Sequence, residues 1–284
     1  MLKFSDDVSS LKSSIRQKVV FTIASKRIED FKETDSYAPM THTGDEWYQT
    51  NRLIYHAAGG VDGMSYTNSR EALEQTLLRG NRIIEIDFAY TSDGHLVCVH
   101  DWNGISQQSK ALTLDAYRQL RIYGKYTPLT AEELLAYMRE YEDLYIVFDT
   151  KESNANQVVL DLIELCGEGS SLPDRFIIQL YSGGNKQILM DAYPFKDENF
   201  LFTAYKFGTE NPIKILELCY RENISVITAP QGSLSADAIE LFAEKGFILF
   251  EHTVNRPDEA NKALQKGVYG LYTDFLWPDD LNIP

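Results

Sequence analysis

The feature that most constrains the fold is a regular alternation of short apolar runs and amphipathic segments that begins at residue 53. Eight apolar runs have the length and composition of buried strands; they lie at 53–57, 83–90, 144–150, 176–181, 200–205, 224–229, 247–254 and 269–273. Segments with helical periodicity separate most of these runs, and several end at a Gly or Asn that commonly terminates a helix: Gly80, Asn223, Gly246 and Gly267.

Eight strands alternating with helices predict an α/β protein with a (β/α)8 TIM barrel. A doubly wound sheet is the alternative. Such a sheet usually carries a glycine-rich phosphate loop after its first strand, and residues 56–60 (HAAGG) lack the spacing of that loop. The barrel is therefore the favoured fold.

The charge composition excludes some classes of partner. The 284 residues include 27 Lys and Arg against 42 Asp and Glu, which gives a formal net charge of −15. General binders of nucleic acid or of anionic membranes need a positive field, so neither class is expected. If this acidic protein acts on a phosphate, the site needs a local positive charge, such as a metal ion.

The first 50 residues differ from the rest and are expected to form a separate N-terminal unit, followed by the barrel domain at 51–284. Residues 8–32 predict an accessory helix with a narrow apolar stripe at Leu11, Ile15, Val19 and Ile23, and a membrane-surface helix is the less favoured alternative. Residues 33–50 are polar and aperiodic, which predicts a linker.

The chain shows no sign of secretion or of membrane insertion. No apolar run at the N-terminus is long enough for a signal peptide or a membrane span. Cys98, Cys166 and Cys219 are widely spaced, which predicts neither a disulfide framework nor a zinc site. A cytoplasmic protein without an integral membrane segment is expected, and the oligomeric state is not indicated.

One segment departs from the strand–helix repeat. Residues 91–101 (TSDGHLVCVHD) follow the second strand directly and combine a tight-turn signal with an alternating strand pattern. They predict a β-hairpin inserted after strand 2, which would fold His100 back beside Glu85 and Asp87. A barrel does not need such a hairpin, so we expect it to serve a site.

Polar residues gather where the predicted strands end, which is where barrel enzymes carry their active sites. They are His56, Glu85, Asp87, His100, Asp149 and Lys151. Residues two apart on a strand face the same side, so Glu85 and Asp87 share one face, as do Asp149 and Lys151. Three carboxylates that converge inside a barrel need a cation, and an all-oxygen ligand set suits Mg²⁺ or Ca²⁺.

Each of these residues also has an ordinary structural interpretation. An isolated pair of acids on a strand is often outward-facing or in a salt bridge, and a lone histidine is often only a hydrogen-bonded structural residue. Substrate contacts are less clearly marked. Gln179 ends the fourth barrel strand; Trp102 lies in an insertion expected over the barrel mouth; Trp277 follows the last strand and could line the mouth or plug the barrel end.

These motifs together resemble the glycerophosphodiester phosphodiesterase family, part of the phosphatidylinositol-phospholipase-C-like barrel superfamily. Residues 56–101 are similar to its H-R-G, P-E-N-T, E-x-D, T-x-D-G and V-x-x-H-D motifs in order. Residues 149–151 (DTK) are similar to its E-x-K strand, and residues 253–274 resemble its closing T-V-N…T-D signature. The resemblance covers about residues 52–278 and leaves the N-terminal unit outside.

The resemblance implies a role for each matched residue. His56 and His100 match the acid–base histidines; Glu85, Asp87 and Asp149 match the ligands of one divalent metal ion; Lys151 matches a lysine that holds the phosphate. The implied activity is metal-dependent cleavage of a small-molecule phosphodiester derived from glycerol or a lipid. The general chemistry of phosphodiester cleavage agrees with these roles, because the reaction needs one base, one acid and a positive charge at the phosphate.

Three departures from the family pattern bear on the substrate. Ala57 stands at the arginine of H-R-G, Tyr66 and Thr67 replace Pro-Glu of P-E-N-T, and Asp149 is shorter than the usual Glu. The aspartate also resembles sphingomyelinase-D-like phospholipases, so a cyclising lyase is one alternative function. A non-catalytic binding barrel is the other.

Overall fold

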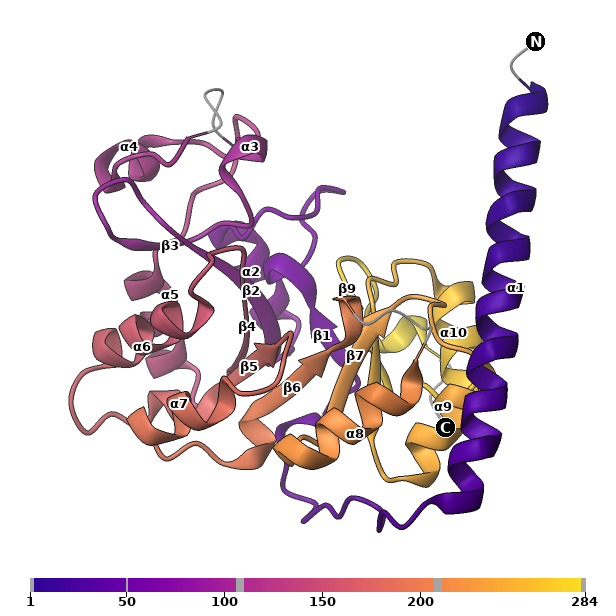
Figure 1. Ribbon diagram of the computed structural model, residues 1–284. Helices are drawn as coiled ribbons and strands as arrows, with labels where there is room; N and C mark the ends of the chain where they lie inside the picture. Colours follow the sequence, from indigo (N-terminus) through magenta and orange to yellow (C-terminus); the bar gives the residue numbers. More distant parts are fainter. Residues whose placement is uncertain (1–2, 50, 106–109, 207–210, 282–284) are drawn as a thin grey trace.

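The predicted barrel is present in the computed structural model, which describes residues 3–49, 51–105, 110–206 and 211–281 (Figure 1). Eight parallel strands pair in the order β1, β2, β4, β5, β6, β7, β8, β9, and β9 pairs back with β1 to close the barrel. They are β1 Leu53–Tyr55, β2 Ile83–Tyr90, β4 Tyr145–Thr150, β5 Phe176–Leu180, β6 Phe200–Thr203, β7 Val226–Pro230, β8 Ile248–His252 and β9 Gly270–Thr273.

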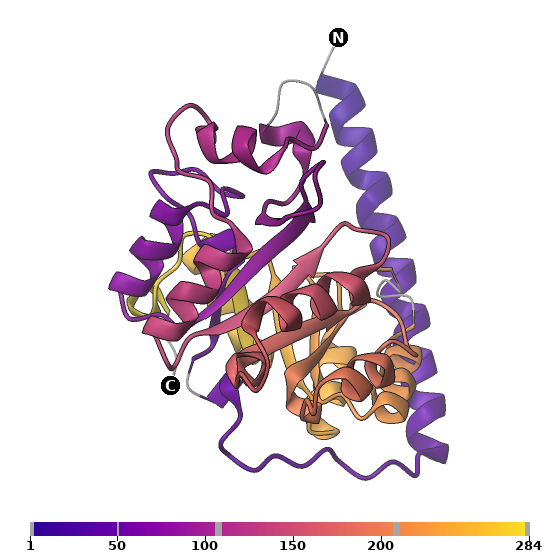
Figure 2. The ribbon, with the colours of Figure 1, turned by 90° about the vertical axis from the view of Figure 1, so that its left-hand side faces the viewer.

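Helices connect these strands and cover the outside of the barrel (Figure 2). They are α2 Arg70–Leu78, α5 Ala131–Glu140, α6 Ala155–Cys166, α7 Lys186–Ala192, α8 Pro212–Glu222, α9 Ala236–Glu244 and α10 Pro257–Gln265. Local signals fix where they begin: the Thr130 hydroxyl accepts a hydrogen bond from the backbone N–H of Glu133, whose carboxylate accepts one from the Thr130 N–H.

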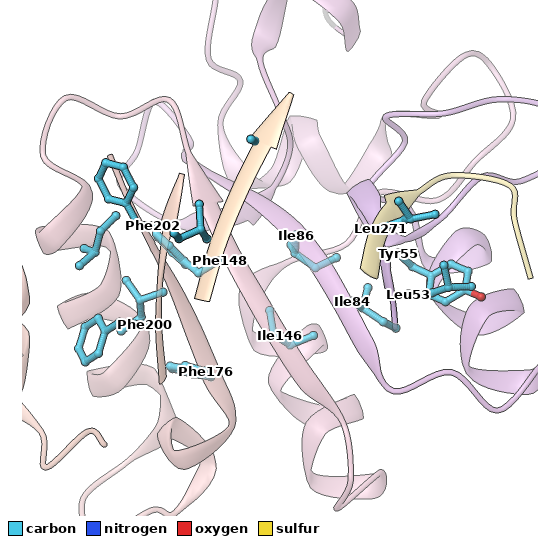
Figure 3. Close-up of a cluster of buried hydrophobic side chains, with 14 of the residues drawn as sticks. Leu53, Tyr55, Ile84, Ile86, Ile146, Phe148, Phe176, Phe200, Phe202 and Leu271 are labelled. Atoms are coloured by element: carbon cyan, nitrogen blue, oxygen red, sulfur yellow. The ribbon is translucent and has the colours of Figure 1, made fainter. Parts of the chain in front are cut away.

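Inward and outward residues alternate along each strand and build two apolar layers. The outer layer lies between strands and helices and includes Leu53, Ile84, Phe148 and Phe200 (Figure 3). The inner layer fills one end of the barrel with Ile54, Ile83, Val147, Ile177, Leu201, Val226, Phe250 and Tyr272.

An aromatic plug closes the end of the barrel where the strands begin. The short 3-10 helix Trp47–Gln49 buries Trp47 and Tyr48 almost completely, and the Trp47 ring stacks on Phe250 at 5.9 Å between centroids. The segment 33–50, expected as a linker, therefore ends in residues of the core. Two adjacent aromatic residues in a polar segment were the available signal.

The expected accessory helix is α1 (Lys3–Thr34), which packs against α8 and α9 and extends past them along one side of the barrel (Figure 1). It docks through Ala24 and Ile28, which are buried, whereas Val19 and Ile23 of the predicted stripe are exposed. The contact stripe is thus shifted by one residue from the predicted one. The side chains of Leu11 and Ile15 lie outside the described residues. Within the described chain, no helix has the length and apolar character needed to cross a membrane.

The hairpin predicted after strand 2 is also confirmed. Strand β3 (Leu96–Cys98) pairs antiparallel with the end of β2, and the Val99 N–H donates to the Asp87 carbonyl at 2.8 Å. Two short helices, α3 (Trp102–Ile105) and α4 (Leu114–Gln119), follow β3 on the side of the barrel away from α1 (Figure 1). The hairpin thus carries residue 100 to the carboxyl end of β2.

Candidate active site

A cavity of about 250 Å³ opens at the carboxyl ends of the barrel strands. It lies at the end opposite the Trp47 plug, where the inward positions of the strands change from apolar to polar. Its walls are formed by His56, Tyr66, Glu85, Asp87, His100, Asp149, Lys151, Gln179, Tyr181, Thr203, Tyr205, His252, Thr253 and Tyr272. Seven of these residues are among those the sequence predicts for the site.

Three carboxylates meet on the floor of this cavity. Glu85 and Asp87 point inward from β2, and Asp149 stands opposite Asp87 in the register of β4 with β2. One oxygen of each carboxylate lies within 4.8 Å of the others, and all three side chains are buried. The two-residue spacing on one strand and the parallel register of the next bring them together.

The electrostatics of this cluster favour a bound cation. Burial raises the pKa of Glu85 well above its usual value, and the negative charges of Asp87 and Asp149 raise it further. Burial and the Asp149 charge likewise raise the pKa of Asp87. Three buried carboxylates with raised proton affinity and oxygen donors fit a hard divalent cation such as Mg²⁺ or Ca²⁺.

Hydrogen bonds from the loop after β1 hold the two carboxylates of β2. The backbone N–H of Ala57 donates to Glu85 Oε2 at 2.7 Å. The Asn68 side chain donates to Asp87 Oδ2 at 2.9 Å and accepts from the Asp87 N–H at 3.1 Å. One oxygen of each carboxylate is thereby fixed, that of Glu85 by a backbone N–H and that of Asp87 by a side chain of the same loop.

The third carboxylate is held from its own strand and from β5. The Tyr181 hydroxyl donates to Asp149 Oδ1 at 2.5 Å, as does the Thr150 N–H at 2.8 Å. The Lys151 ammonium lies 3.4 Å from Asp149 Oδ2. Partial burial lowers the pKa of Lys151, but the carboxylates of Asp149 and Asp87 outweigh it and raise that pKa overall. Lys151 is therefore a stable positive charge at the cavity wall.

His56 is oriented by a buried acid at the end of β9. Its Nδ1 lies 2.9 Å from Asp274 Oδ1, and its Nε2 lies 4.0 Å from Glu85 Oε2. Asp274 also accepts from the Asn255 side chain at 2.7 Å, and its carbonyl accepts from the Gly60 N–H at 2.6 Å. A side chain at Gly60 would collide with this segment. An ionised Asp274 places the imidazole proton on Nδ1, so Nε2 faces the carboxylates with a lone pair.

The second histidine reaches the cavity from the hairpin. His100 Nδ1 lies 2.8 Å from Asp101 Oδ2, which is more exposed than Asp274. The Tyr66 ring stands between the two imidazoles and contacts both by an edge, at 4.5 Å from His56 and 5.1 Å from His100 between centroids. The two histidines thus share one wall of the cavity, with a tyrosine between them.

A third histidine, His252 at the end of β8, also faces the cavity. Burial, and then the proximity of His56, lowers the pKa of His252 to about 4. Its Nδ1 lies 2.8 Å from the Thr228 hydroxyl. His252 is therefore a neutral hydrogen-bonding group at physiological pH.

Two residues predicted as substrate contacts lie elsewhere. Trp102 packs against Tyr117 in the insertion, at 5.8 Å between ring centroids. Trp277 packs on the outward face of Tyr55 at 5.2 Å and under the Arg79 guanidinium at 3.9 Å. Neither residue is among those that line the cavity, so the geometry does not support them as substrate contacts.

The residues that hold or line the site without having been predicted include four with a clear structural role: Tyr66, Tyr181, His252 and Asp274. Three of them end or directly follow barrel strands, so the rule that found Asp149 would have found them too. Tyr66 had no such signal, because it lies in an irregular loop.

Comparison with known protein families finds one family whose profile matches most of the chain. The profile of the glycerophosphoryl diester phosphodiesterase family matches residues 60–277. A search of curated proteins finds no match.

Solved structures share the fold at low sequence identity. An Oleispira antarctica phosphodiesterase in complex with the product sn-glycerol-3-phosphate is 16% identical, with a TM-score of 0.63 over 81% of this chain and 95% of that one. A glycerophosphodiester phosphodiesterase from Parabacteroides distasonis is 18% identical, with a TM-score of 0.62 over 78% of this chain and 92% of that one. A candidate glycerophosphodiester phosphodiesterase from Galdieria sulphuraria is 18% identical, with a TM-score of 0.64 over 79% and 94%.

Proposed function

The chain belongs to the glycerophosphoryl diester phosphodiesterase family and is thus a phosphoric diester hydrolase, and we propose that it uses one divalent cation and two histidines to cleave a glycerophosphodiester. The observation that carries this proposal is the meeting of three buried carboxylates with His56 and His100 around one cavity. Glu85, Asp87 and Asp149 would hold the cation. When bound, it would offset the negative charge that develops on the phosphate oxygens.

The substrate is proposed to be a small glycerol-derived diester. A cavity of about 250 Å³ suits a phosphodiester with a small alcohol on each side. The structurally similar Oleispira antarctica protein holds the product sn-glycerol-3-phosphate, which motivates the choice of glycerol. Lys151 supplies a positive charge at the cavity wall for a non-bridging phosphate oxygen.

The two histidines are assigned as a base and an acid. His56 is the proposed base, because Asp274 holds its Nδ1 proton and leaves the Nε2 lone pair free. That lone pair can take a proton from the attacking oxygen, which belongs to a water molecule or to a hydroxyl group of the substrate. His100 is the proposed acid, which donates a proton to the departing alkoxide so that it leaves as an alcohol. Its more exposed partner Asp101 allows exchange with solvent after turnover.

Turnover of a panel of glycerophosphodiesters tests the proposal. We expect activity that disappears with a chelator and returns with Mg²⁺ or Ca²⁺, and a loss of about 10²–10⁴-fold in His56→Ala and in His100→Ala. His95→Ala is the matched control, because His95 is exposed in the hairpin turn and lies outside the cavity.

Full activity in both histidine variants would refute the acid–base assignment. Phosphorus NMR of the products separates the alternatives: a phosphomonoester marks hydrolysis, a persistent cyclic phosphate marks a lyase, and phosphate-ligand binding without turnover marks a non-catalytic barrel.

A further inference from the structure

We propose that Tyr66 is a substrate-contacting residue, whose hydroxyl donates a hydrogen bond to the phosphodiester and whose ring keeps His56 and His100 apart. This inference rests on the proposed function, since it concerns the same cavity and the same diester. It assigns a role to a position at which the chain departs from the family pattern.

The first argument is the position of the ring. Tyr66 meets His56 at an interplanar angle of 90° and His100 at 78°, so both imidazoles abut a single phenol ring. The phenol ring thus occupies the space between the two imidazoles and keeps them apart.

The second argument is the hydroxyl. Burial raises the pKa of Tyr66, and the negative charges of Asp274 and Asp87 raise it further, so the phenol stays protonated at neutral pH. Among the described residues, no hydrogen bond of this hydroxyl is found, although the side chain lines the cavity. It is therefore a protonated donor free to bind an anion.

The third argument is the backbone. Tyr66 has φ +57°, in the left-handed region that a bulky side chain adopts at a cost of about 1–2 kcal/mol. Its neighbour Asn68 is fully buried, bonds Asp87 with its side chain and donates its N–H to the Ala57 carbonyl at 3.1 Å. The carboxylate strand thus anchors the loop that holds Tyr66 in this conformation.

The fourth argument is the shortage of cationic side chains. Lys151 is the one cationic side chain, apart from histidines, that lines the cavity in the described residues. Other hydroxyl and amide side chains line the cavity, but among the described residues Tyr66 is the one whose ring contacts both His56 and His100. A phosphodiester seated between the two histidines would therefore meet Tyr66 as the neutral hydrogen-bond donor beside them.

Two substitutions separate the hydroxyl from the ring. Tyr66→Phe removes only the donor; since a hydrogen bond to a charged group is worth about 1.5–3 kcal/mol, we expect KM for the diester and the inhibition constant of inorganic phosphate each to rise about 10-fold or more. The pH–rate profile should keep its shape. Tyr66→Gly also removes the ring, and we expect it to lower kcat in addition to raising KM.

Stability measurements show whether these effects are structural. Tyr66→Gly relieves the left-handed strain, so its Tm should stay close to that of the wild type. Asn223 offers a control for the backbone: it is exposed, has φ +50° at the end of α8, and lies outside the catalytic cavity. Asn223→Gly should leave KM, kcat and the phosphate inhibition constant unchanged.

The outcomes are separable from those of the proposed function. An active wild type, inactive His56→Ala and His100→Ala, and a Tyr66→Phe variant with unchanged KM and phosphate inhibition would overturn the Tyr66 contact alone. Equal effects of Tyr66→Gly and Asn223→Gly on kcat would overturn the role of the ring. If Tyr66→Gly does not fold, Tyr66→Phe still decides the role of the hydroxyl. Active histidine variants would instead refute the proposed function.

Discussion

The two ends of the barrel interior are built from the same strands, but one end is apolar and the other is polar. On β2, inward Ile83 belongs to the apolar end and Glu85, two residues later, to the polar end; on β8, Phe250 and His252 differ in the same way. One step of two residues therefore separates a packed core from a reactive cavity. The apolar end therefore stabilises the barrel. The polar end holds buried charged side chains, whose presence is explained by function and not by stability.

The contrast extends to the charges. The apolar end is closed by stacked rings of Trp47 and Phe250. The polar end concentrates like charges that burial makes unfavourable, as the raised pKa values of Glu85 and Asp87 show. Substitutions at the two ends should therefore separate activity from stability.

The largest expected effect is at the polar end. Asp87→Asn keeps the shape of the side chain but removes one negative charge from the carboxylate cluster. We expect turnover to fall at least about 10³-fold, while the unfolding midpoint in the presence of a chelator stays equal or rises, because a buried repulsion is removed. Steady-state kinetics and thermal unfolding measure the two quantities.

The matched control for Asp87→Asn is Glu140→Gln on the exposed face of α5, which should alter neither quantity. An Asp87→Asn enzyme with near-normal turnover would show that the cluster is not the catalytic centre.

The next effect is at the apolar end. Phe250→Ala opens a cavity against Trp47, and we expect the free energy of unfolding to drop by about 3–5 kcal/mol. KM should stay within about twofold of the wild-type value under conditions where the variant is folded, because Phe250 does not line the catalytic cavity. Val19→Ala, at an exposed site on α1, is the stability control. A large change in KM with little loss of stability would contradict the claim that the apolar end determines stability and the polar end determines activity.

A smaller effect should appear as pH dependence. Unfolded chains protonate histidine below its usual pKa of 6.5, whereas folded His252 stays neutral down to about 4. Folded stability is therefore full above pH 6.5 and declines as the pH falls toward 4, by about 3 kcal/mol from this group.

His252→Gln cannot titrate, so it should lose less stability between pH 7 and pH 4.5 than the wild type does. Urea unfolding at both pH values, with a chelator present, measures the difference. Identical pH dependence in the two proteins would mean that His252 is protonated in the folded state.

The smallest of these effects concerns Tyr181, whose hydroxyl holds Asp149. We expect Tyr181→Phe to weaken binding of Mn²⁺ or Mg²⁺ by about 10-fold, because hydrogen-bond partners behind metal ligands typically contribute 10–100-fold to affinity. Titration calorimetry measures the dissociation constant. Tyr205→Phe is the control, since Tyr205 lines the same cavity but is largely exposed. Equal affinities in both variants would remove Tyr181 from the metal centre.

Sequence reasoning was most successful where the periodicity of a strand or the register between strands determines the structure. Alternation along the strands predicted the barrel and placed Glu85, Asp87 and Asp149 together at one end of its interior. It failed where contacts depend on irregular backbone or on distant packing. Tyr66 reaches the histidines only through a left-handed loop, and Trp277 turns outward to Tyr55 and Arg79. The α1 stripe was displaced by one residue, because the packing of α1 against α8 and α9 buries Ala24 and Ile28 instead of Val19 and Ile23.

The central claim is that the three carboxylates bind a divalent cation beside the two histidines. Anomalous X-ray diffraction from a crystal soaked in Mn²⁺ tests it most directly. The account predicts one strong peak within coordinating distance of Glu85, Asp87 and Asp149, which is lost in Asp87→Asn crystals soaked in the same way. A clear map with no peak among these carboxylates, or an equal peak in the Asp87→Asn crystal, would contradict it.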